Sequence, residues 1–288
     1  MFVKLASYRH SGETSVGVVI GELIYDVTAL RADAPTSMRA FLAWLDTEPE
    51  FAAVDPATAH GIPLGQVSFL PVVTDPHAVW CAALTYLSHV REGGDRPVPD
   101  YPLFFLRVAN SQVGHGDSMC CPSVSDQLDY EGELAVVVGR AGRHIPRSSA
   151  FDHIAGYACY NDGSVRDWQR HTSQITPGKN FSATGGFGPW LVTPDEFGDP
   201  ATRHLETRLN GEVMQSAGID ELLFPIDYMI HYLSTICRLE VGDVIVTGTC
   251  GGVGVRRDPQ VFMKAGDVVE VEIDGIGVLR NTIAAEAI

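Results

Sequence analysis

The sequence has few basic residues for its length. Among its 288 residues, Lys and Arg number 20 against 36 Asp and Glu, which gives a net charge of −16. An acidic surface repels the phosphates of nucleic acids and anionic lipid headgroups, so we expect neither nucleic acid nor a membrane as a partner. The same charge repels acidic substrates at long range, so an acidic substrate would need local cations or a metal ion to bind.

Long hydrophobic runs are also absent. Runs such as Glu133–Gly139 are far shorter than the roughly 20 apolar residues that cross a bilayer. The chain starts MFVKLASYRHSGE, without a basic stretch followed by an apolar run, so we expect no signal peptide and a cytoplasmic location. The six cysteines form no C-x-x-C pair, and scattered reduced thiols agree with that location.

Several common catalytic signatures are missing too. The sequence contains no G-x-S-x-G, no H-E-x-x-H and no P-loop, and Gly251–Gly254 does not form a dinucleotide-binding fingerprint. A serine-hydrolase elbow, a zinc-protease helix and nucleotide binding by these motifs are therefore not indicated.

What is present favours a folded β-rich protein, with 45% hydrophobic residues, 19% charged residues and 29 glycines. Val16–Ile20 and Leu23–Val27 flank a turn and predict a hairpin. The apolar spacing of Ser37–Leu45 predicts a short helix. We expect residues 1–70 to form a small β-rich unit and residues 71–288 to form a second, larger region.

The second region predicts mostly strands and few helices, a mainly β α+β fold arranged as a sandwich or distorted barrel. Asp220–Arg238 is the best predicted helix, because its apolar residues recur at a period near 3.6. The predicted strands are Val79–Ala83, Phe104–Arg107, Gly132–Val138, Ile154–Tyr160, Trp190–Thr193, Glu206–Leu209, Val244–Thr247, Val268–Ile273 and Gly277–Asn281.

Glu131 and Glu133 stand at the start of the most apolar predicted strand. Residues two apart in a strand point to the same face, so the two carboxylates should project together and repel each other unless a cation or proton lies between them. Oxygen ligands without a nearby Cys or His set favour Mg²⁺, Mn²⁺ or Ca²⁺ over zinc. The alternative is a solvated strand edge, where the pattern E-x-E is common. A third carboxylate, Asp162, ends a predicted strand before Gly163, and by itself is typical of a turn residue.

At this point the sequence resembles the fumarylacetoacetate hydrolase family. The resemblance is carried by segments in one order along the chain: D-Y-E-x-E-L-A-x-V at Asp129–Val137, G-Y-x-x-x-N-D-x-S-x-R-D-x-Q at Gly156–Gln169, G-K-x-F at Gly178–Phe181, G-P-W-L-V at Gly188–Val192, N-G-E at Asn210–Glu212 with Gln215, G-D-V-I-x-T-G-T-x-x-G-V-G at Gly242–Gly254, and G-D-x-V-x-V-x-I-x-G-I-G at Gly266–Gly277.

The resemblance implies a twisted mixed β-roll around a metal site, assembled as a homodimer. It also implies that residues 1–70 are a small N-terminal cap-like domain and residues 71–288 the catalytic domain. It implies Glu131, Glu133 and Asp162 as the metal ligands, with Mg²⁺, or Mn²⁺ or Ca²⁺, as the ion. It also implies that His89 and Glu92 form an H-x-x-E dyad in a loop that closes over the site.

The resemblance implies further roles around the metal. It matches Lys179 with a lysine beside the metal-bound substrate, and it places Arg166, Gln169 and Thr249 where they bind the substrate. We also expect Tyr86, in the loop around His89, and Arg107, which keeps the charge of the family's lysine, to bind the substrate. If Ser88–Gly93 makes a helical turn, Glu92 faces His89 and fixes its tautomer.

Four positions depart from the family pattern. Thr85 falls where G-x-N-Y is usual, Arg107 replaces the lysine of F-L-K-P, Ser182 replaces the aspartate of G-K-x-F-D, and Cys250 replaces the proline of T-G-T-P. Arginine keeps the charge of lysine but offers a planar fork. We expect an altered substrate wall and a substrate outside the commonest acylpyruvates.

Three functions follow as expectations. The first is metal-dependent hydrolysis of a C–C bond in a β-diketo or acylpyruvate-type acid, with His89 activating water and Lys179 stabilising the enolate. The second is decarboxylation or keto–enol isomerisation of a 2-oxo dicarboxylate from aromatic catabolism. The third is a catalytically silent binding protein. One fold can support several chemistries, so the fold does not decide between them.

Overall fold

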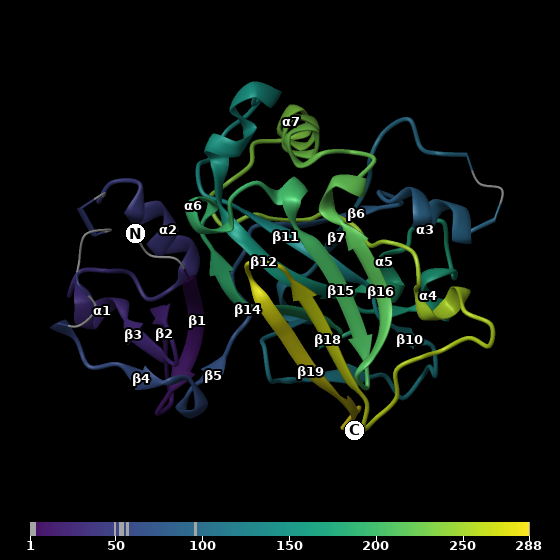
Figure 1. Ribbon diagram of the computed structural model, residues 1–288, viewed down its shortest axis with the longest axis horizontal. Helices are drawn as coiled ribbons and strands as arrows, with labels where there is room; N and C mark the ends of the chain where they lie inside the picture. The colour runs from purple at the N-terminus through teal and green to yellow at the C-terminus, as the bar shows by residue number, and fades with distance from the viewer. Residues whose placement is uncertain (1–3, 49, 52–54, 56–57, 95–96, 288) are drawn as a thin grey trace.

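Short strands of both orientations dominate the chain, and few helices accompany them (Figure 1), as the mainly β α+β prediction requires. The computed structural model describes residues 4–48, 50–51, 55, 58–94 and 97–287.

The strands are β1 Lys4–His10, β2 Glu13–Ile20, β3 Leu23–Asp26, β4 Ile62–Pro63, β5 Ser68–Phe69, β6 Val79–Ala83, β7 Leu103–Arg107, β8 Gln112–Val113, β9 Ser118–Cys121, β10 Leu128–Asp129, β11 Gly132–Val138, β12 Ile154–Asp162, β13 Ser164–Val165, β14 Gly185–Val192, β15 His204–Leu209, β16 Glu212–Gly218, β17 Val244–Val246, β18 Val268–Ile273 and β19 Gly277–Ala285. The α-helices are α1 Val27–Leu30, α2 Met38–Leu45, α3 Leu87–Glu92, α4 Arg166–Gln169, α5 Thr176–Lys179, α6 Pro194–Phe197 and α7 Ile226–Ile236. Short 3₁₀ turns occupy Leu64–Gln66, Ala109–Ser111, Arg147–His153, Pro200–Thr202, Ile219–Glu221 and Gly254–Arg256.

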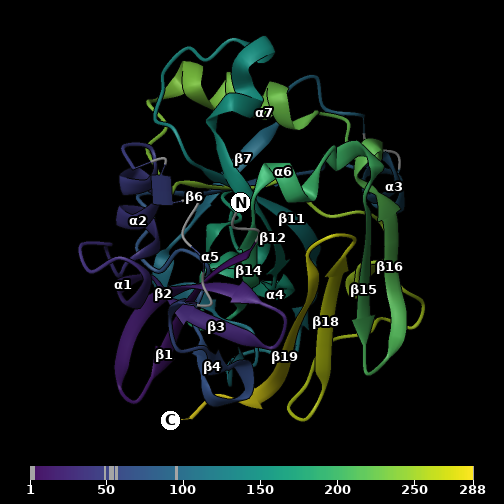
Figure 2. The same ribbon diagram turned by 60° about the vertical axis from the view of Figure 1, so that its left-hand side comes forward.

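The largest sheet runs in the order β4-β3-β2-β1-β14-β12-β11-β17-β6-β7. Most neighbours are antiparallel, but β17 and β6 are parallel, so the sheet is mixed. The N-terminal strands join this sheet through β1, where Leu5 lies opposite Leu191 of β14 (Figure 2). The division near residue 70 therefore crosses a continuous sheet, and two separate domains remain a prediction.

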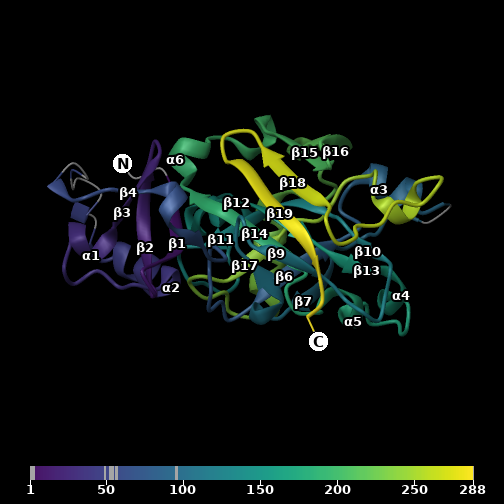
Figure 3. The same ribbon diagram turned by 90° about the horizontal axis from the view of Figure 1, so that it is seen from below.

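A second sheet, in the order β16-β15-β18-β19-β9, covers one side of the first. Its strands β18 and β19 lie against β12 and β14, as Figure 3 shows from below. The contact is possible because the inner positions of β18 are apolar, with Val269, Val271 and Ile273 all buried. Strand β11 consequently lies in the interior of the protein.

Strand β11 is buried on both of its faces. Leu134 and Val136 pack with residues of the second sheet and of α7, whereas Ala135 and Val137 pack with the helix α2 side of the core. Such a strand reads as a continuous apolar run instead of an alternating one. Glu133 is placed at the buried end of this run, where an unpaired carboxylate would be costly.

Most of the expected elements are confirmed. The hairpin forms as β2 and β3, the helix at residues 38–45 begins after the N-cap Ser37, and β11 and β18 have the expected bounds. Among the described residues, no helix is long and apolar enough to cross a membrane.

Two expected elements need correction. The helix expected over Asp220–Arg238 begins only at Ile226, because Pro225 provides no backbone N–H and occupies the N-cap. Strand β14 starts at Gly185, well before the expected Trp190. Its glycines indicate a loop in the sequence. Gly186 packs closely against the second sheet, since a Cβ there would lie 2.7 Å from Asn281 Oδ1 of β19.

Candidate active site

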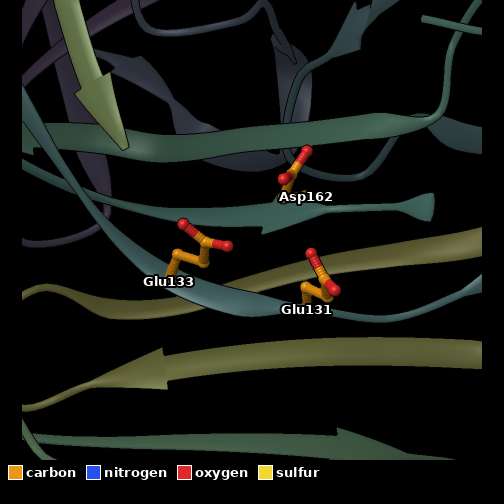
Figure 4. A group of neighbouring side chains, drawn as sticks. All are labelled: Glu131, Glu133 and Asp162. Carbon is orange, nitrogen blue, oxygen red and sulfur yellow. The ribbon is translucent and has the colours of Figure 1, made fainter. Parts of the chain in front are cut away.

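Three carboxylates meet where β11 begins and β12 ends. The two strands are antiparallel, with Gly132 opposite Asn161, so the start of one lies beside the end of the other. Asp162 N donates to Glu131 O at 2.8 Å, which fixes this register next to the carboxylates. One oxygen from each of Glu131, Glu133 and Asp162 lies within 4.8 Å of the others, and Figure 4 shows the three side chains on adjacent strands.

The glycine between the two glutamates is required by close packing. A Cβ on Gly132 would lie 1.9 Å from Thr207 Oγ1 on β15, far closer than atoms can approach. The Gly132 N–H donates to Gln215 Oε1 at 2.9 Å. The pattern E-G-E therefore reflects two needs, a shared face for the carboxylates and room for the second sheet.

Buried cations surround two of the three carboxylates. Lys179 Nζ lies 2.5 Å from Glu131 Oε2 and 2.6 Å from Asp162 Oδ2. Arg166 Nη2 lies 2.7 Å from Glu131 Oε1, close enough for an ion pair although not aligned as a hydrogen bond. Arg107 Nη1 donates to Asp162 Oδ1 at 2.6 Å. Burial alone would raise the pKa of Glu131, but Arg166 and Lys179 outweigh it and hold that pKa well below its usual value.

Glu133 differs from its two neighbours, because it makes no ion pair with any side chain that the structure describes. It is 1% exposed, and its Oε2 accepts the Gly248 N–H at 2.5 Å. Burial raises its pKa well above the usual value, and the nearby charges of Asp162 and Glu131 raise it further. A buried carboxylate without a counter-charge, beside two others, fits a divalent cation with hard oxygen ligands such as Mg²⁺ or Mn²⁺.

Lys179 is well suited to remain charged. Burial would lower its pKa, but Asp162 and Glu131 outweigh burial and raise it. The lysine is the last residue of α5, and Gly178 before it packs so tightly that a Cβ there would lie 2.5 Å from Gln169 N. The ammonium group is thus held beside the carboxylates as a fixed positive charge.

His89 and Glu92 form the expected pair on α3. His89 Nδ1 lies 2.6 Å from Glu92 Oε1, at i and i+3 of one helical turn. The other oxygen, Glu92 Oε2, accepts the Gly252 N–H at 2.8 Å, and Ser88 Oγ accepts the Gly251 N–H at 3.1 Å. With Nδ1 engaged by a carboxylate, Nε2 of His89 is the ring atom left to exchange protons.

Most of these groups line one cavity of about 300 Å³. The expected site residues that line it are His89, Glu131, Glu133, Arg166, Gln169, Lys179 and Thr249. Four expected site residues are not among the lining residues: Tyr86, Glu92, Arg107 and Asp162. Glu92 and Asp162 lie directly behind the lining, paired with His89 and Lys179. Arg107 lies behind Asp162 and also donates to Gly163 O and Thr184 Oγ1, while Tyr86 is 2% exposed in the core. We therefore propose a positioning role for Arg107 in place of substrate contact.

The four departures from the family pattern also lie outside the cavity lining. Thr85 is fully buried and donates to Thr247 O at 2.7 Å, Cys250 is 2% exposed in the core, and Ser182 is exposed elsewhere. The structure therefore does not support the expectation that these four positions alter the substrate wall directly.

Two site residues were missed from the sequence. Gln215 Nε2 donates to Thr249 Oγ1 at 2.7 Å, so Gln215 positions both the threonine hydroxyl and the Gly132 amide. Asp129 is fully buried and accepts from Arg166 Nε and from the Gly254 and Val255 amides at 2.8–2.9 Å. Both stand in the quoted motifs, but only the fold shows which distant backbone groups they bind.

A buried cluster of three carboxylates that could hold a metal ion, beside a lysine and set in a mixed β fold, indicates the class of protein to which this chain belongs. The chain belongs to the fumarylacetoacetate hydrolase family. The model of the fumarylacetoacetate (FAA) hydrolase C-terminal region matches residues 78–284, most of the chain. The family expected from the sequence motifs is thereby confirmed.

Relatives and solved structures agree with this assignment. The mitochondrial oxaloacetate tautomerase FAHD2A of Bos taurus is 38% identical over 265 residues, covering 90% of this chain and 83% of that protein. A fumarylacetoacetate hydrolase from Exiguobacterium antarcticum superposes with a TM-score of 0.87 at 33% identity, covering 99% of this chain and all of the other. A maleylpyruvate hydrolase from Sphingobium sp. SYK-6, solved with manganese(II) and pyruvate, gives a TM-score of 0.83 at 27% identity, covering 99% of this chain and all of the other. Hydrolase and tautomerase names therefore both occur among similar proteins.

Proposed function

We propose that this chain is a metal-dependent enzyme that interconverts the keto and enol forms of a 2-oxo acid of the oxaloacetate type. The observation that carries the proposal is the meeting of Glu131, Glu133, Lys179 and His89 at one cavity. Asp162 completes the three-carboxylate cluster and Glu92 pairs with His89, both just outside the lining. The name of the Bos taurus relative supports the choice of reaction over the hydrolysis that we expected first from the sequence.

A divalent ion held by Glu131, Glu133 and Asp162 would polarise the 2-oxo group and bind the adjacent carboxylate oxygen. Lys179, held as a cation, faces the negative charge that develops when the substrate loses a proton next to its carbonyl. Arg166 lines the same cavity and has N–H groups that can reach a substrate carboxylate. Thr249 also lines it, but its hydroxyl already donates to Gly132 O at 3.0 Å.

His89 is the residue that moves the proton. Its Nδ1 is hydrogen-bonded to Glu92, which leaves Nε2 to take a proton from the carbon next to the carbonyl. Nε2 then gives a proton to the carbonyl oxygen. Glu92 orients the ring and favours the tautomer in which Nε2 accepts. The step conserves all atoms, because the proton leaves carbon and an equivalent proton is added to oxygen.

Hydrolysis of a C–C bond in an acylpyruvate-type acid is the second candidate. It is favoured by the same His89–Glu92 pair, since a base with a free Nε2 can also take a proton from water. The maleylpyruvate hydrolase among the similar structures supports it. Decarboxylation of a 2-oxo dicarboxylate and a catalytically silent binding protein are the remaining alternatives.

The test is turnover of enol-oxaloacetate and of a panel of acylpyruvates, with Mg²⁺ or Mn²⁺ and with a chelator. Loss of enol absorbance with unchanged product mass supports the tautomerase, and two acid products support the hydrolase. Release of carbon dioxide identifies a decarboxylase. Absence of metal-dependent turnover across the panel would contradict an enzyme of this class.

Four further properties stay predictions. They are Mg²⁺ as the native ion, assembly as a homodimer, a cytoplasmic location and a role in aromatic catabolism. The Bos taurus relative is named as mitochondrial, so location in particular needs a direct measurement such as fractionation.

A further inference from the structure

The cavity carries two arginines that the proposed chemistry does not use. Arg170 and Arg256 both line it together with Glu131, Glu133 and Lys179. Both side chains are exposed, and neither makes an ion pair or a side-chain hydrogen bond with any residue in the described part of the chain. Two unpaired guanidinium groups give this cavity local positive charge on a protein whose net charge is −16.

The deeper cations of the site are already neutralised. Lys179 pairs with Glu131 and Asp162, and Arg166 pairs with Asp129 and Glu131. These pairs leave no strong excess of positive charge at the bottom of the cavity. Among the lysine and arginine side chains that line the cavity, the two outer arginines are therefore the ones without a carboxylate partner in the described part of the chain.

Both arginines are placed by the same buried carboxylate. Asp129 accepts from Arg166 Nε at the start of α4, and Arg170 is the C-cap of that helix. Asp129 also accepts the Gly254 and Val255 amides, which begin the 3₁₀ turn that ends at Arg256. The side chains of both arginines are exposed, but the helix and the turn that carry them are both anchored by hydrogen bonds to the buried Asp129.

The rest of the lining suits a carbon chain between two charged ends. Phe105, Ile175 and Val255 contribute apolar surface to the same cavity. A guanidinium group binds carboxylates through parallel N–H donors, and the pairs are stronger than neutral hydrogen bonds. Local cations would also counter the repulsion that the acidic protein exerts on an anionic substrate.

We infer that Arg170 and Arg256 bind a second carboxylate at the far end of the substrate, so that the enzyme selects 2-oxo dicarboxylates over 2-oxo monocarboxylates of equal length. The inference rests on the proposed function, because it assumes that the 2-oxo acid end lies at the three-carboxylate site. In this scheme Arg170 and Arg256 select the substrate, and His89 transfers the proton.

The test is calorimetric binding of two five-carbon acids to the Mn²⁺-loaded protein. 2-Oxoglutarate ends in a carboxylate and 2-oxopentanoate ends in a methyl group, so they differ only at the far end. We expect the wild-type protein to bind 2-oxoglutarate at least about tenfold more tightly, the scale of two partly exposed charge-assisted contacts. The double variant R170Q/R256Q should lose this preference and keep its affinity for 2-oxopentanoate.

The matched control is Arg238→Gln, which removes the same charge from an exposed arginine outside the cavity lining. It should keep the full preference for the dicarboxylate. Equal affinities in the wild-type protein, or an unchanged preference in the double variant, would overturn the inference while leaving the 2-oxo acid site intact. Failure of the Mn²⁺-loaded protein to bind either acid would instead refute the proposed function, and the inference with it.

Discussion

Glu133→Gln should leave the stability of the metal-free protein unchanged or slightly higher and remove most of the stabilisation that a metal ion provides. Glu133 is buried, has no ion-pair partner among the described residues and lies within 4.8 Å of two other carboxylates. Two full charges at this distance repel by roughly 3 kcal/mol at an effective dielectric constant of about 20. The raised pKa of Glu133 shows how the metal-free protein avoids this repulsion, by favouring the protonated form.

A glutamine at this position keeps the shape and can still accept the Gly248 N–H. We therefore expect the metal-free variant to be as stable as the wild-type protein, or slightly more stable. Metal binding stabilises the folded state by about 2.7 kcal/mol when the free ion is at 100 times its Kd. For a chain of 288 residues that corresponds to a rise in Tm of about 4–5 °C in the wild-type protein, most of which the variant should lose.

The assay is thermal unfolding of both proteins with a chelator and with Mn²⁺. Glu13→Gln, a change of the same kind at an exposed position, should behave as the wild-type protein under both conditions. A Glu133→Gln variant that keeps the full Mn²⁺ shift would refute Glu133 as a ligand. A variant that loses several degrees without metal would refute the argument that its charge is a burden in the metal-free fold.

Three further changes test other parts of the site. His89→Gln should leave Mn²⁺ affinity intact and lower kcat by about 10²- to 10⁴-fold, measured by calorimetry and enol-oxaloacetate turnover. Gly132→Ala should destabilise the protein by about 1–3 kcal/mol, because its Cβ would lie 1.9 Å from Thr207 Oγ1, and adding Thr207→Ala should recover part of the loss in denaturant unfolding. Gln215→Ala should cost about 1–3 kcal/mol by leaving the buried Gly132 N–H unpaired, and should weaken binding of 2-oxo acids through Thr249.

Each of these changes has a result that contradicts its premise. Undiminished turnover in His89→Gln would exclude His89 as the base. A Gly132→Ala variant that unfolds as the wild-type protein does would show that β15 can move away. Normal stability in Gln215→Ala would mean that water replaces its carbonyl oxygen at the Gly132 amide.

The sequence predicted the parts of the site that lie close together along the chain. Glu131 and Glu133 share a face because strand geometry requires it, and His89 meets Glu92 because helical geometry requires it. Asp162 could be placed beside them only through the family resemblance, since 29 or more residues separate it from both glutamates along the chain.

What the sequence could not predict are contacts between distant segments. Arg107 pairs with Asp162, and Asp129 binds both Arg166 and the loop at Gly254, across separations that no local pattern encodes. The same limit explains β14, whose glycines indicate a loop until their packing against a second sheet is seen. Arg107 was expected to contact the substrate, but it is buried and pairs with the candidate metal ligand Asp162.

The most direct test of the account is a crystal structure of the protein grown with Mn²⁺ and pyruvate, with the ion located by its anomalous scattering. We predict one ion bound by Glu131, Glu133 and Asp162, with the 2-oxo acid on its open side next to Lys179 and facing His89. An ion bound elsewhere, or none among these three carboxylates at saturating Mn²⁺, would contradict the central claim.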